Sequence, residues 1–301
     1  MGLKLAHLIL AHANPKQLNR FVKRLKHEDA DIYIHLDAKA SLADFEFIGQ
    51  SAKVIFIKDR ISISWGTYSI VRATLCSMQE ILDSGINYSH INLLSGQDYP
   101  LKNAEDIHAF FSANKGKSFI ECPAIDKNWV SGYRRLQYYD FGDFDFPGHY
   151  ALQSVIKFFN LKKRMPDHLI PMGRSQWFSI TPECVAYTIK YLRDHPRVER
   201  FFRMSFAADE IVFQTILGNS ALKDTLVANS LRYINFPENE SHPEILTIND
   251  ALPMVNSGKL YARKFNPQVD SAVLDYLDQV ADNGYQSTEE KDKLLQHYLN
   301  L

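Results

Sequence analysis

The stretch from Ser89 to Lys102 constrains the fold of this chain more than any other. It begins as a short, mostly apolar run typical of a buried strand and then breaks at a polar turn, Ser95-Gly96-Gln97-Asp98-Tyr99-Pro100. Gly96 permits unusual backbone angles, Pro100 interrupts a strand ladder, and Asn103 follows as the N-cap candidate of a helix. Open α/β sheets bind ligands where a central strand ends at such a turn, although a plain strand-to-helix connection gives the same pattern.

Strands and helices alternate along the first part of the chain. Apolar runs at 5–11, 31–37 and 54–57 predict three further strands. Helical spacing follows the first run, where Asn14 precedes Pro15 as cap and first helical residue. This alternation predicts an α/β fold with a mostly parallel, doubly wound sheet and helices on both faces.

The pattern changes in the second part of the chain. Residues 126–150 are rich in aromatic side chains without steady periodicity, which is typical of a recognition surface but also of a loop packed onto the core. Two helices are expected farther on, one capped by Thr181 and one over 207–218 with Asp209 as its cap. A last amphipathic helix is expected over 269–280.

The overall charge and the cysteines narrow the function classes. The 301 residues carry a formal net charge of -1, so nothing in the balance favours nucleic acid as a partner. The cysteines number three and are widely separated, which fits neither a disulfide framework nor a zinc cluster and suits a reducing cytosol. The apolar N-terminal run is typical of a first buried strand, not of a signal peptide. We therefore expect a cytoplasmic protein.

Glu210 and the pair Arg263 and Lys264 are the first candidates for chemistry. An acid in the first turn of a helix is favoured by the helix dipole alone, and the same position suits a general base. Adjacent strand residues face opposite sides, so one of the two cations is expected in solvent. If the backbone bends there, both can reach one phosphate.

A metal site is the weaker alternative. His12, His35 and Asp37 fall at the ends of two predicted strands, and Asp-x-Asp occurs at 29–31 and 143–145. The first of these pairs precedes a strand and the second lies in the aromatic segment. The sequence contains no phosphate loop of the G-x-x-x-x-G-K-[ST] type, no G-x-G-x-x-G after a strand and no G-x-S-x-G elbow.

Several blocks, in order along the chain, carry a resemblance to a known family. They are Leu10-Ala-His-Ala-Asn14, Ile34-His-Leu-Asp37, Ser64-Trp-Gly-Thr-Tyr-Ser-Ile-Val71, Ile91-Asn-Leu-Leu-Ser-Gly-Gln-Asp-Tyr-Pro-Leu-Lys102 and Ser175-Gln-Trp-Phe-Ser-Ile-Thr-Pro-Glu-Cys-Val185, followed by Asp209-Glu210-Ile-Val-Phe-Gln-Thr215 and Ala262-Arg-Lys-Phe265. The chain resembles the core-2/I-branching β-1,6-N-acetylglucosaminyltransferases and the related peptide O-xylosyltransferases, in a short form like that of bacterial members.

The resemblance implies a GT-A type glycosyltransferase fold and an inverting, metal-independent transfer from a UDP-sugar. UDP-N-acetylglucosamine is the expected donor, and no metal cofactor is expected. Glu210 then deprotonates the acceptor hydroxyl, and Lys264 with Arg263 neutralises the β-phosphate of the departing UDP. We expect a single domain over 1–301: a nucleotide-binding half at 1–120, an acceptor and catalytic half at 121–266, and a helical segment at 267–301.

The resemblance also implies roles for residues around this centre. The expected donor-binding residues are His12, Asn14, Asp37, Trp65 and Asp98, in addition to the two cations. The expected substrate-binding residues are Gln97, Trp129, Arg134, Arg135, Ser175, Gln176, Trp177 and Asp209. The acceptor would be a glycan or glycolipid of a surface polysaccharide pathway, reached by peripheral contact with the inner face of a membrane.

Two departures and two rival functions remain open. The animal enzymes carry a membrane anchor and many disulfides, and their second basic phosphate contact has no clear counterpart around 241–244. The first rival function is a non-catalytic protein that binds glycans or a partner through the aromatic segment. The second is a metal-dependent hydrolase built on His12, His35 and Asp37.

Overall fold

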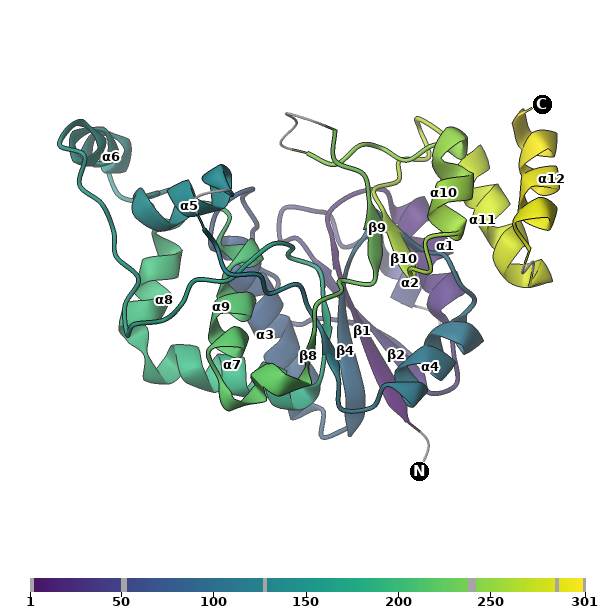
Figure 1. The fold of residues 1–301 in the computed structure, drawn as a ribbon, viewed down its shortest axis with the longest axis horizontal. Helices are drawn as coiled ribbons and strands as arrows, with labels where there is room; N and C mark the ends of the chain where they lie inside the picture. Colours follow the sequence, from purple (N-terminus) through teal and green to yellow (C-terminus); the bar gives the residue numbers. More distant parts are fainter. Residues whose placement is uncertain (1–2, 50–52, 127–128, 238–241, 285–286, 300–301) are drawn as a thin grey trace.

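A seven-stranded sheet of order β3-β2-β1-β4-β7-β6-β8 forms the centre of the protein (Figure 1). The computed structural model describes residues 3–49, 53–126, 129–237, 242–284 and 287–299. The strands are β1 (Lys4–Ala11), β2 (Ala30–Leu36), β3 (Val54–Phe56), β4 (Tyr88–Ser95), β6 (Ser118–Phe119), β7 (Ser179–Ile180) and β8 (Leu226–Val227). Strands β3, β2, β1 and β4 are parallel, and β7 runs antiparallel to both of its neighbours. The expected α/β class and mostly parallel sheet are confirmed.

Helices cover both faces of this sheet, as expected. The helices are α1 (Pro15–Leu25), α2 (Glu46–Gly49), α3 (Ser69–Asp83), α4 (Ala104–Ala113), α5 (Val130–Gln137), α6 (His149–Phe158), α7 (Pro182–Asp194), α8 (Pro196–Arg203), α9 (Val212–Gly218), α10 (Ala251–Val255), α11 (Ala272–Asn283) and α12 (Thr288–Leu299). Helices α3, α7 and α9 lie on one side of the sheet, and α1, α4 and the C-terminal helices lie on the other (Figure 1).

Strand β1 explains why both faces are covered. Its odd-numbered apolar residues, such as Leu5 and Ile9, belong to the core under α1 and α4. Its even-numbered residues, such as Leu8, belong to the core under α3 and α7. Successive strand residues point to opposite faces, so a continuous apolar run can be buried only when both faces carry helices.

The predicted helix caps are confirmed at two places and wrong at a third. Asn103 Oδ1 accepts the Asp106 amide at 2.7 Å, and Thr181 Oγ1 accepts the Cys184 amide at 3.4 Å. Asn14 precedes α1, but its backbone is left-handed and its side chain caps nothing. The first turn of α1 instead makes a long-range contact: Gln17 Nε2 donates to the carbonyl of Phe265 at 3.2 Å.

The turn after β4 differs from its prediction. Asp98–Pro100 forms strand β5, which joins β10 (Tyr261–Arg263) and β9 (Arg232–Ile234) in a second sheet. Gly96 has no positive φ. A Cβ there would lie 3.3 Å from the Ala11 Cβ. A glycine at this position therefore allows the ends of β4 and β1 to lie close together.

Two further predictions about local structure were wrong. The aromatic segment 126–150 contains helix α5 and the start of α6, and residues 127–128 lie outside the described part. The helix expected over 207–218 is a 3₁₀ turn, η1 (Ala208–Glu210), followed by α9 from Val212. Asp209 is therefore no N-cap, and Glu210 ends the turn before α9.

The C-terminal helices are tied to the first part of the chain by charge. Arg20 on α1 bonds Asp275 and Asp278 on α11, each at 2.7 Å. The Tyr99 hydroxyl on β5 donates to Asp278 at 2.8 Å. These contacts fix α11 against α1 and the second sheet. No helix within the described residues is long and apolar enough to cross a membrane.

Candidate active site

The site lies where three neighbouring parallel strands end. The Gly96 amide donates to the Leu10 carbonyl and the Asp37 amide to the Ala11 carbonyl, both at 2.8 Å. The residues that follow β1, β2 and β4 therefore lie side by side, and they include His12 and Gln97. Ligands of open α/β sheets bind at this edge because the backbone there leaves the ladder and exposes polar groups.

Arg263 is held at this edge by a carboxylate and an indole. Its Nε donates to Asp98 Oδ1 at 3.0 Å, and its guanidinium lies 4.2 Å from the centre of the Trp177 ring. Asp98 is completely buried, and its other oxygen accepts the Ser95 amide at 3.0 Å. Asp98 thus positions Arg263 instead of facing a ligand directly.

Burial shapes the protonation of this pair. Burial raises the pKa of the Asp98 carboxyl, and the Arg263 guanidinium opposes that rise. Burial likewise lowers the pKa of Arg263, while Asp98, Asp209 and Glu210 raise it. One cation is therefore surrounded by three carboxyl groups contributed by two separate segments.

Lys264 lies beside Arg263 with its backbone tied to the same edge. The next residue, Phe265, donates its amide to the Gln97 carbonyl at 2.9 Å and accepts Gln17 Nε2 from the first turn of α1 at 3.2 Å. Lys264 is half-buried, and the described residues offer its ammonium no hydrogen bond or ion pair. The ammonium is therefore available to an anion between α1 and the β4 turn.

Glu210 forms an ion pair with Arg135 of α5. The contact uses Oε2; within the described part of the chain Oε1 has no hydrogen bond. About a third of the carboxylate side chain is exposed (30%), so a ligand can approach it. The Arg135 guanidinium also lies over the rings of Trp129, at 5.7 Å, and Phe206, at 5.8 Å.

The backbone under Glu210 is tightly fixed. The Arg174 amide donates to the Glu210 carbonyl at 3.1 Å. A Cβ on Gly173 would lie 2.4 Å from the same carbonyl oxygen, so only glycine fits there. Ser175 and Gln176 continue this segment, which places them beside Glu210.

Buried polar atoms mark the interior of the site. Burial raises the pKa of the Asp209 carboxyl, and the neighbouring Glu210 carboxylate raises it further. Asp209 Oδ1 and Gln176 Nε2 are both buried without a hydrogen-bond partner in the described structure. Such atoms are uncommon in folded proteins and favour a place where a ligand binds.

Trp65 lies at the rim. Its ring is 67% exposed and packs edge-on against Phe206, with centroids 5.2 Å apart. The His242 ring lies 5.2 Å away on another segment. Trp65 contacts Phe206, the Phe206 ring contacts the Arg135 guanidinium, and Arg135 pairs with Glu210. Trp65 is therefore connected to Glu210 indirectly.

Asp37 and His35 have structural partners. Asp37 accepts the amides of Lys39, at 2.8 Å, and Ile63, at 3.2 Å. His35 Nε2 accepts the Ile61 amide at 3.0 Å, and burial lowers its pKa. The exposed His12 shares no contact with either, so the three residues proposed for a hydrolase form no metal-binding set among the described residues.

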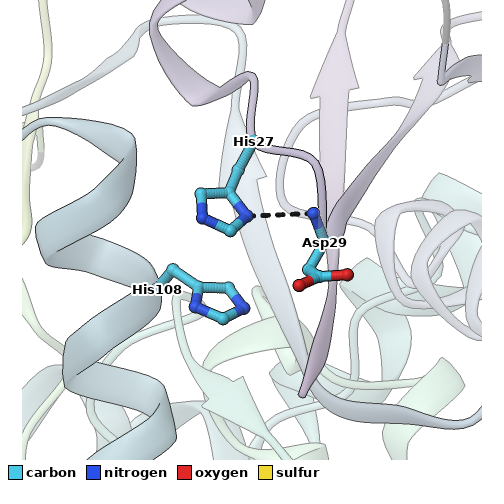
Figure 2. Close-up of side chains that lie close together, drawn as sticks. All are labelled: His27, Asp29 and His108. Atoms are coloured by element: carbon cyan, nitrogen blue, oxygen red, sulfur yellow. Dashed lines mark hydrogen bonds between the residues drawn. The ribbon is translucent and has the colours of Figure 1, made fainter. Parts of the chain in front are cut away.

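The residues that best match metal-ligand spacing lie at the opposite edge of the sheet. They are His27, Asp29 and His108, between α1, the start of β2 and α4 (Figure 2). The two imidazoles are stacked at 12° with centroids 4.1 Å apart, so their nitrogen lone pairs lie in nearly parallel planes. His27 Nδ1 already accepts the Asp29 amide at 3.0 Å. This geometry favours a hydrogen-bonded cluster over a metal centre.

An open cleft of about 690 Å³ adjoins the Glu210 segment. Its walls include Glu121, Cys122, Met172, Arg174 and Lys223. Arg174 connects the cleft to the site: its backbone amide donates to the Glu210 carbonyl, and its guanidinium lies 6.0 Å from the centre of the Trp129 ring. The cleft was not predicted, because its residues come from three separated segments, 120–123, 172–174 and 218–228.

Two residues depart from the sequence-based picture. Arg134 is exposed, and its side chain forms no hydrogen bond or ion pair with the described residues around Glu210. Arg232, which was not predicted, is buried and donates to the carbonyls of Leu93, at 2.7 Å, and Phe178, at 3.1 Å. It holds the end of β4 against the segment that carries Trp177. The residues next to Arg232 in the sequence form no motif that predicts a buried arginine.

The arrangement combines one accessible carboxylate with two cations a short way along the same edge. A carboxylate with a free oxygen can accept a proton, and the cations can neutralise an anionic leaving group. This set suits an acid–base transfer in which phosphate departs.

Comparison with known proteins gives a matching family and several similar proteins. Residues 5–254 match the model of the Core-2/I-Branching enzyme family. Xylosyltransferase 2 of Canis lupus familiaris and that of Homo sapiens are each 27% identical over 303 residues, covering 92% of this chain. The alignment covers 33% of each relative, so the chain spans about a third of their length.

Among solved structures, the crystal structure of S. aureus TarS 1–349 aligns over 99% of this chain and 71% of that chain, with a TM-score of 0.40 and 10% identity. The family match covers most of the chain, including the ends of β1, β2 and β4 and Glu210, and it stops before Arg263 and Lys264. It agrees with the resemblance drawn from the sequence blocks. The chain belongs to the Core-2/I-Branching enzyme family.

Proposed function

We propose that this protein is an inverting glycosyltransferase that moves a sugar, N-acetylglucosamine in the first instance, from a UDP-sugar to a hydroxyl of a glycan or glycolipid. The observation that carries the proposal is that one segment, residues 174–177, contacts both centres: the Arg174 amide donates to the Glu210 carbonyl, and the Trp177 ring lies against Arg263. This segment lies by the strand ends where open α/β sheets bind ligands. The names of the relatives support transfer of a sugar, with xylose as the second donor to test. The setting we propose is cytoplasmic, with peripheral membrane contact.

Glu210 acts as the general base. Oε1 accepts the proton of the acceptor hydroxyl as that oxygen attacks the anomeric carbon, and the bond to the UDP oxygen breaks on the opposite face. Arg135 holds the other carboxylate oxygen and thereby aims Glu210. General-base catalysis of this kind contributes roughly 10²–10⁴-fold in rate.

Arg263 and Lys264 neutralise the departing diphosphate. Arg263 is fixed by Asp98 and Trp177, so it needs little reorganisation during the reaction. Lys264 precedes Phe265, whose carbonyl accepts Gln17 Nε2 from the first turn of α1, and the backbone amides of that turn also favour phosphate. Two such cations can take the role that a divalent metal has in other sugar transfers.

The cleft beside Arg174 receives the acceptor. It opens from the Glu210 segment and carries Glu121 and Lys223, which can hydrogen-bond sugar hydroxyls, beside the apolar Met172. Acceptor sugars pair polar edges with apolar faces, so a mixed wall of this kind suits them.

The direct test is a thermal-shift screen with UDP, UDP-N-acetylglucosamine, UDP-xylose, UDP-galactose and UDP-glucose. A true donor binds only the folded state and so raises the melting temperature by mass action. At a ligand concentration a hundredfold above Kd, the unfolding free energy rises by about 2.7 kcal/mol. ADP-glucose and GDP-mannose serve as controls for base selectivity. The absence of a shift with every uridine compound would contradict the proposal.

Metal independence is tested separately by activity with EDTA. The proposal expects sugar transfer, and slow donor hydrolysis, to continue when EDTA is in excess over total metal. Loss of activity with EDTA and its return with Mn²⁺ would assign the charge neutralisation to a metal and not to Lys264.

A further inference from the structure

Helix α6 presents an apolar face to solvent. None of its residues is buried, and it stands apart from the body of the protein (Figure 1). The exposed fractions are 83% for Phe158, 66% for Phe159 and 52% for Val155. An exposed patch of this size on a soluble domain marks an interaction surface.

An ordinary surface helix turns its apolar face toward the core, whereas α6 turns its apolar face toward solvent. Leu152, Val155 and Phe159 recur at helical spacing and form one stripe. Gln153, on the opposite side, accepts the Phe141 amide at 3.0 Å and so faces the body. In α1, by contrast, the apolar stripe that includes Phe21 is buried. The apolar face of α6 is therefore directed away from the protein's own core.

Positive charge accompanies this face. No Asp or Glu occurs between Asp145 and Asp167, in a chain whose net charge is -1. Lys157, Lys162 and Arg164 are all exposed in this interval. An apolar stripe flanked by cations, with aromatic side chains at its end, has the composition of a helix that lies in the interface of an anionic membrane.

We infer that α6 docks on an anionic lipid bilayer, with Leu152, Val155, Phe158 and Phe159 entering the interface and the exposed Lys162 and Arg164, which follow the helix, contacting lipid phosphates. Figure 1 places α6 toward the same side as the carboxyl ends of the parallel strands, so docking brings the candidate site toward the membrane. The inference deepens the membrane contact of the proposed function and rests on it for the glycolipid acceptor.

The test is co-sedimentation of the full chain with vesicles, which requires no turnover. Vesicles of equal phosphatidylcholine and phosphatidylglycerol should retain the protein, and pure phosphatidylcholine should not. Added salt should weaken binding, because the basic residues act through a screened attraction. Failure of this test would leave sugar transfer to a soluble acceptor unaffected, so the two proposals fail separately.

Variants locate the surface. F158S/F159S should lower vesicle binding at least tenfold, and K162E/R164E should lower it by roughly fivefold or more per charge at low salt. F47S/K115E changes an exposed phenylalanine on α2 and an exposed lysine after α4, and should bind like the parent. Thermal melting of each variant verifies that it folds.

Three results would overturn the inference. The first is no binding to the anionic vesicles, and the second is binding that F158S/F159S leaves unchanged. The third is a concentration-dependent dimer, measured by sedimentation velocity, that F158S/F159S converts to monomer while vesicles retain neither form. That last result would assign the face to contact between copies of this chain.

Discussion

The Arg263 Nε donates to Asp98 Oδ1 at 3.0 Å, so a buried carboxylate fixes the cation expected to meet the leaving phosphate. The two residues are 165 positions apart, and they meet because β5 and β10 pair, with Arg263 opposite Asp98. The pair is both a structural tie between two segments and the support of the candidate phosphate site.

Removing the charge of Asp98 tests this double role. Asp98→Asn removes the one carboxylate that is hydrogen-bonded to the largely buried Arg263, so we expect a loss of about 3–5 kcal/mol in unfolding free energy and weaker UDP binding. Urea unfolding and calorimetric titration with UDP measure the two effects. In the double variant D98N/R263M, part of the stability should return while UDP binding stays weak. A D98N protein as stable as the parent would refute the pairing.

Lys264 should behave differently from Arg263, because its ammonium has no partner in the described part of the protein. Lys264→Ala should weaken UDP binding about tenfold and change the unfolding free energy by less than about 0.5 kcal/mol. Lys115→Ala, an exposed lysine elsewhere, is the matched control. Unchanged UDP affinity in the Lys264 variant would remove this residue from the phosphate site.

Gly173 tests whether the backbone under Glu210 matters for rate. In Gly173→Ala the new Cβ would lie 2.4 Å from the Glu210 carbonyl oxygen, so that segment must move. We expect kcat to fall by roughly 10²-fold. Gly116→Ala adds a Cβ to open space at φ +82°, so it should cost stability without lowering kcat. Equal kcat in both variants would contradict the expectation.

Lys163 gives the protein a defined pH dependence of stability. Burial lowers its pKa from 10.5 to about 7, with Nζ donating to Met204 O at 2.5 Å and Ser205 Oγ at 2.6 Å. Between these two values the unfolded chain binds this proton and the folded chain does not. The folded state therefore gains stability from this group as pH rises through the window, by up to about 1.4 kcal/mol per unit.

The measurement is urea unfolding at several pH values between about 7 and 9 for the parent, Lys163→Met and Lys162→Met. The difference between the parent and the Lys163 variant should shift in favour of the parent as pH rises. The Lys162 variant, which alters an exposed neighbour, should follow the parent. Parallel curves for the parent and Lys163→Met would contradict the lowered pKa.

The first half of the fold was predictable because its signals are local. Long apolar runs gave β1, β2 and β4, and polar residues before helical spacing gave the caps at Asn103 and Thr181. The family was predictable for a related reason: its short blocks occur in order along the chain, and the family model matches residues 5–254.

The rest depends on contacts between distant residues. Strand β8 has only two residues and is fixed by pairing with β6, so no run of its own signals it. Helix α5 was hidden by Gly132 and by aromatic residues without helical periodicity. The ion pair of Arg135 with Glu210 joins residues 75 positions apart. In the sequence, Arg135 and Glu210 each look like an ordinary surface charge, and only the fold brings the two side chains together.

Glu210→Gln tests the proposed chemistry most directly, because the amide keeps the shape of the side chain and removes the base. The measurement is donor turnover with acceptor, together with the Kd for UDP. We predict that kcat falls by roughly 10²–10⁴-fold while UDP binds within about twofold of the parent affinity, since the cations are intact. A variant that keeps its turnover would contradict Glu210 as the base, and a parent protein that binds UDP without turnover would support a non-catalytic binding function instead.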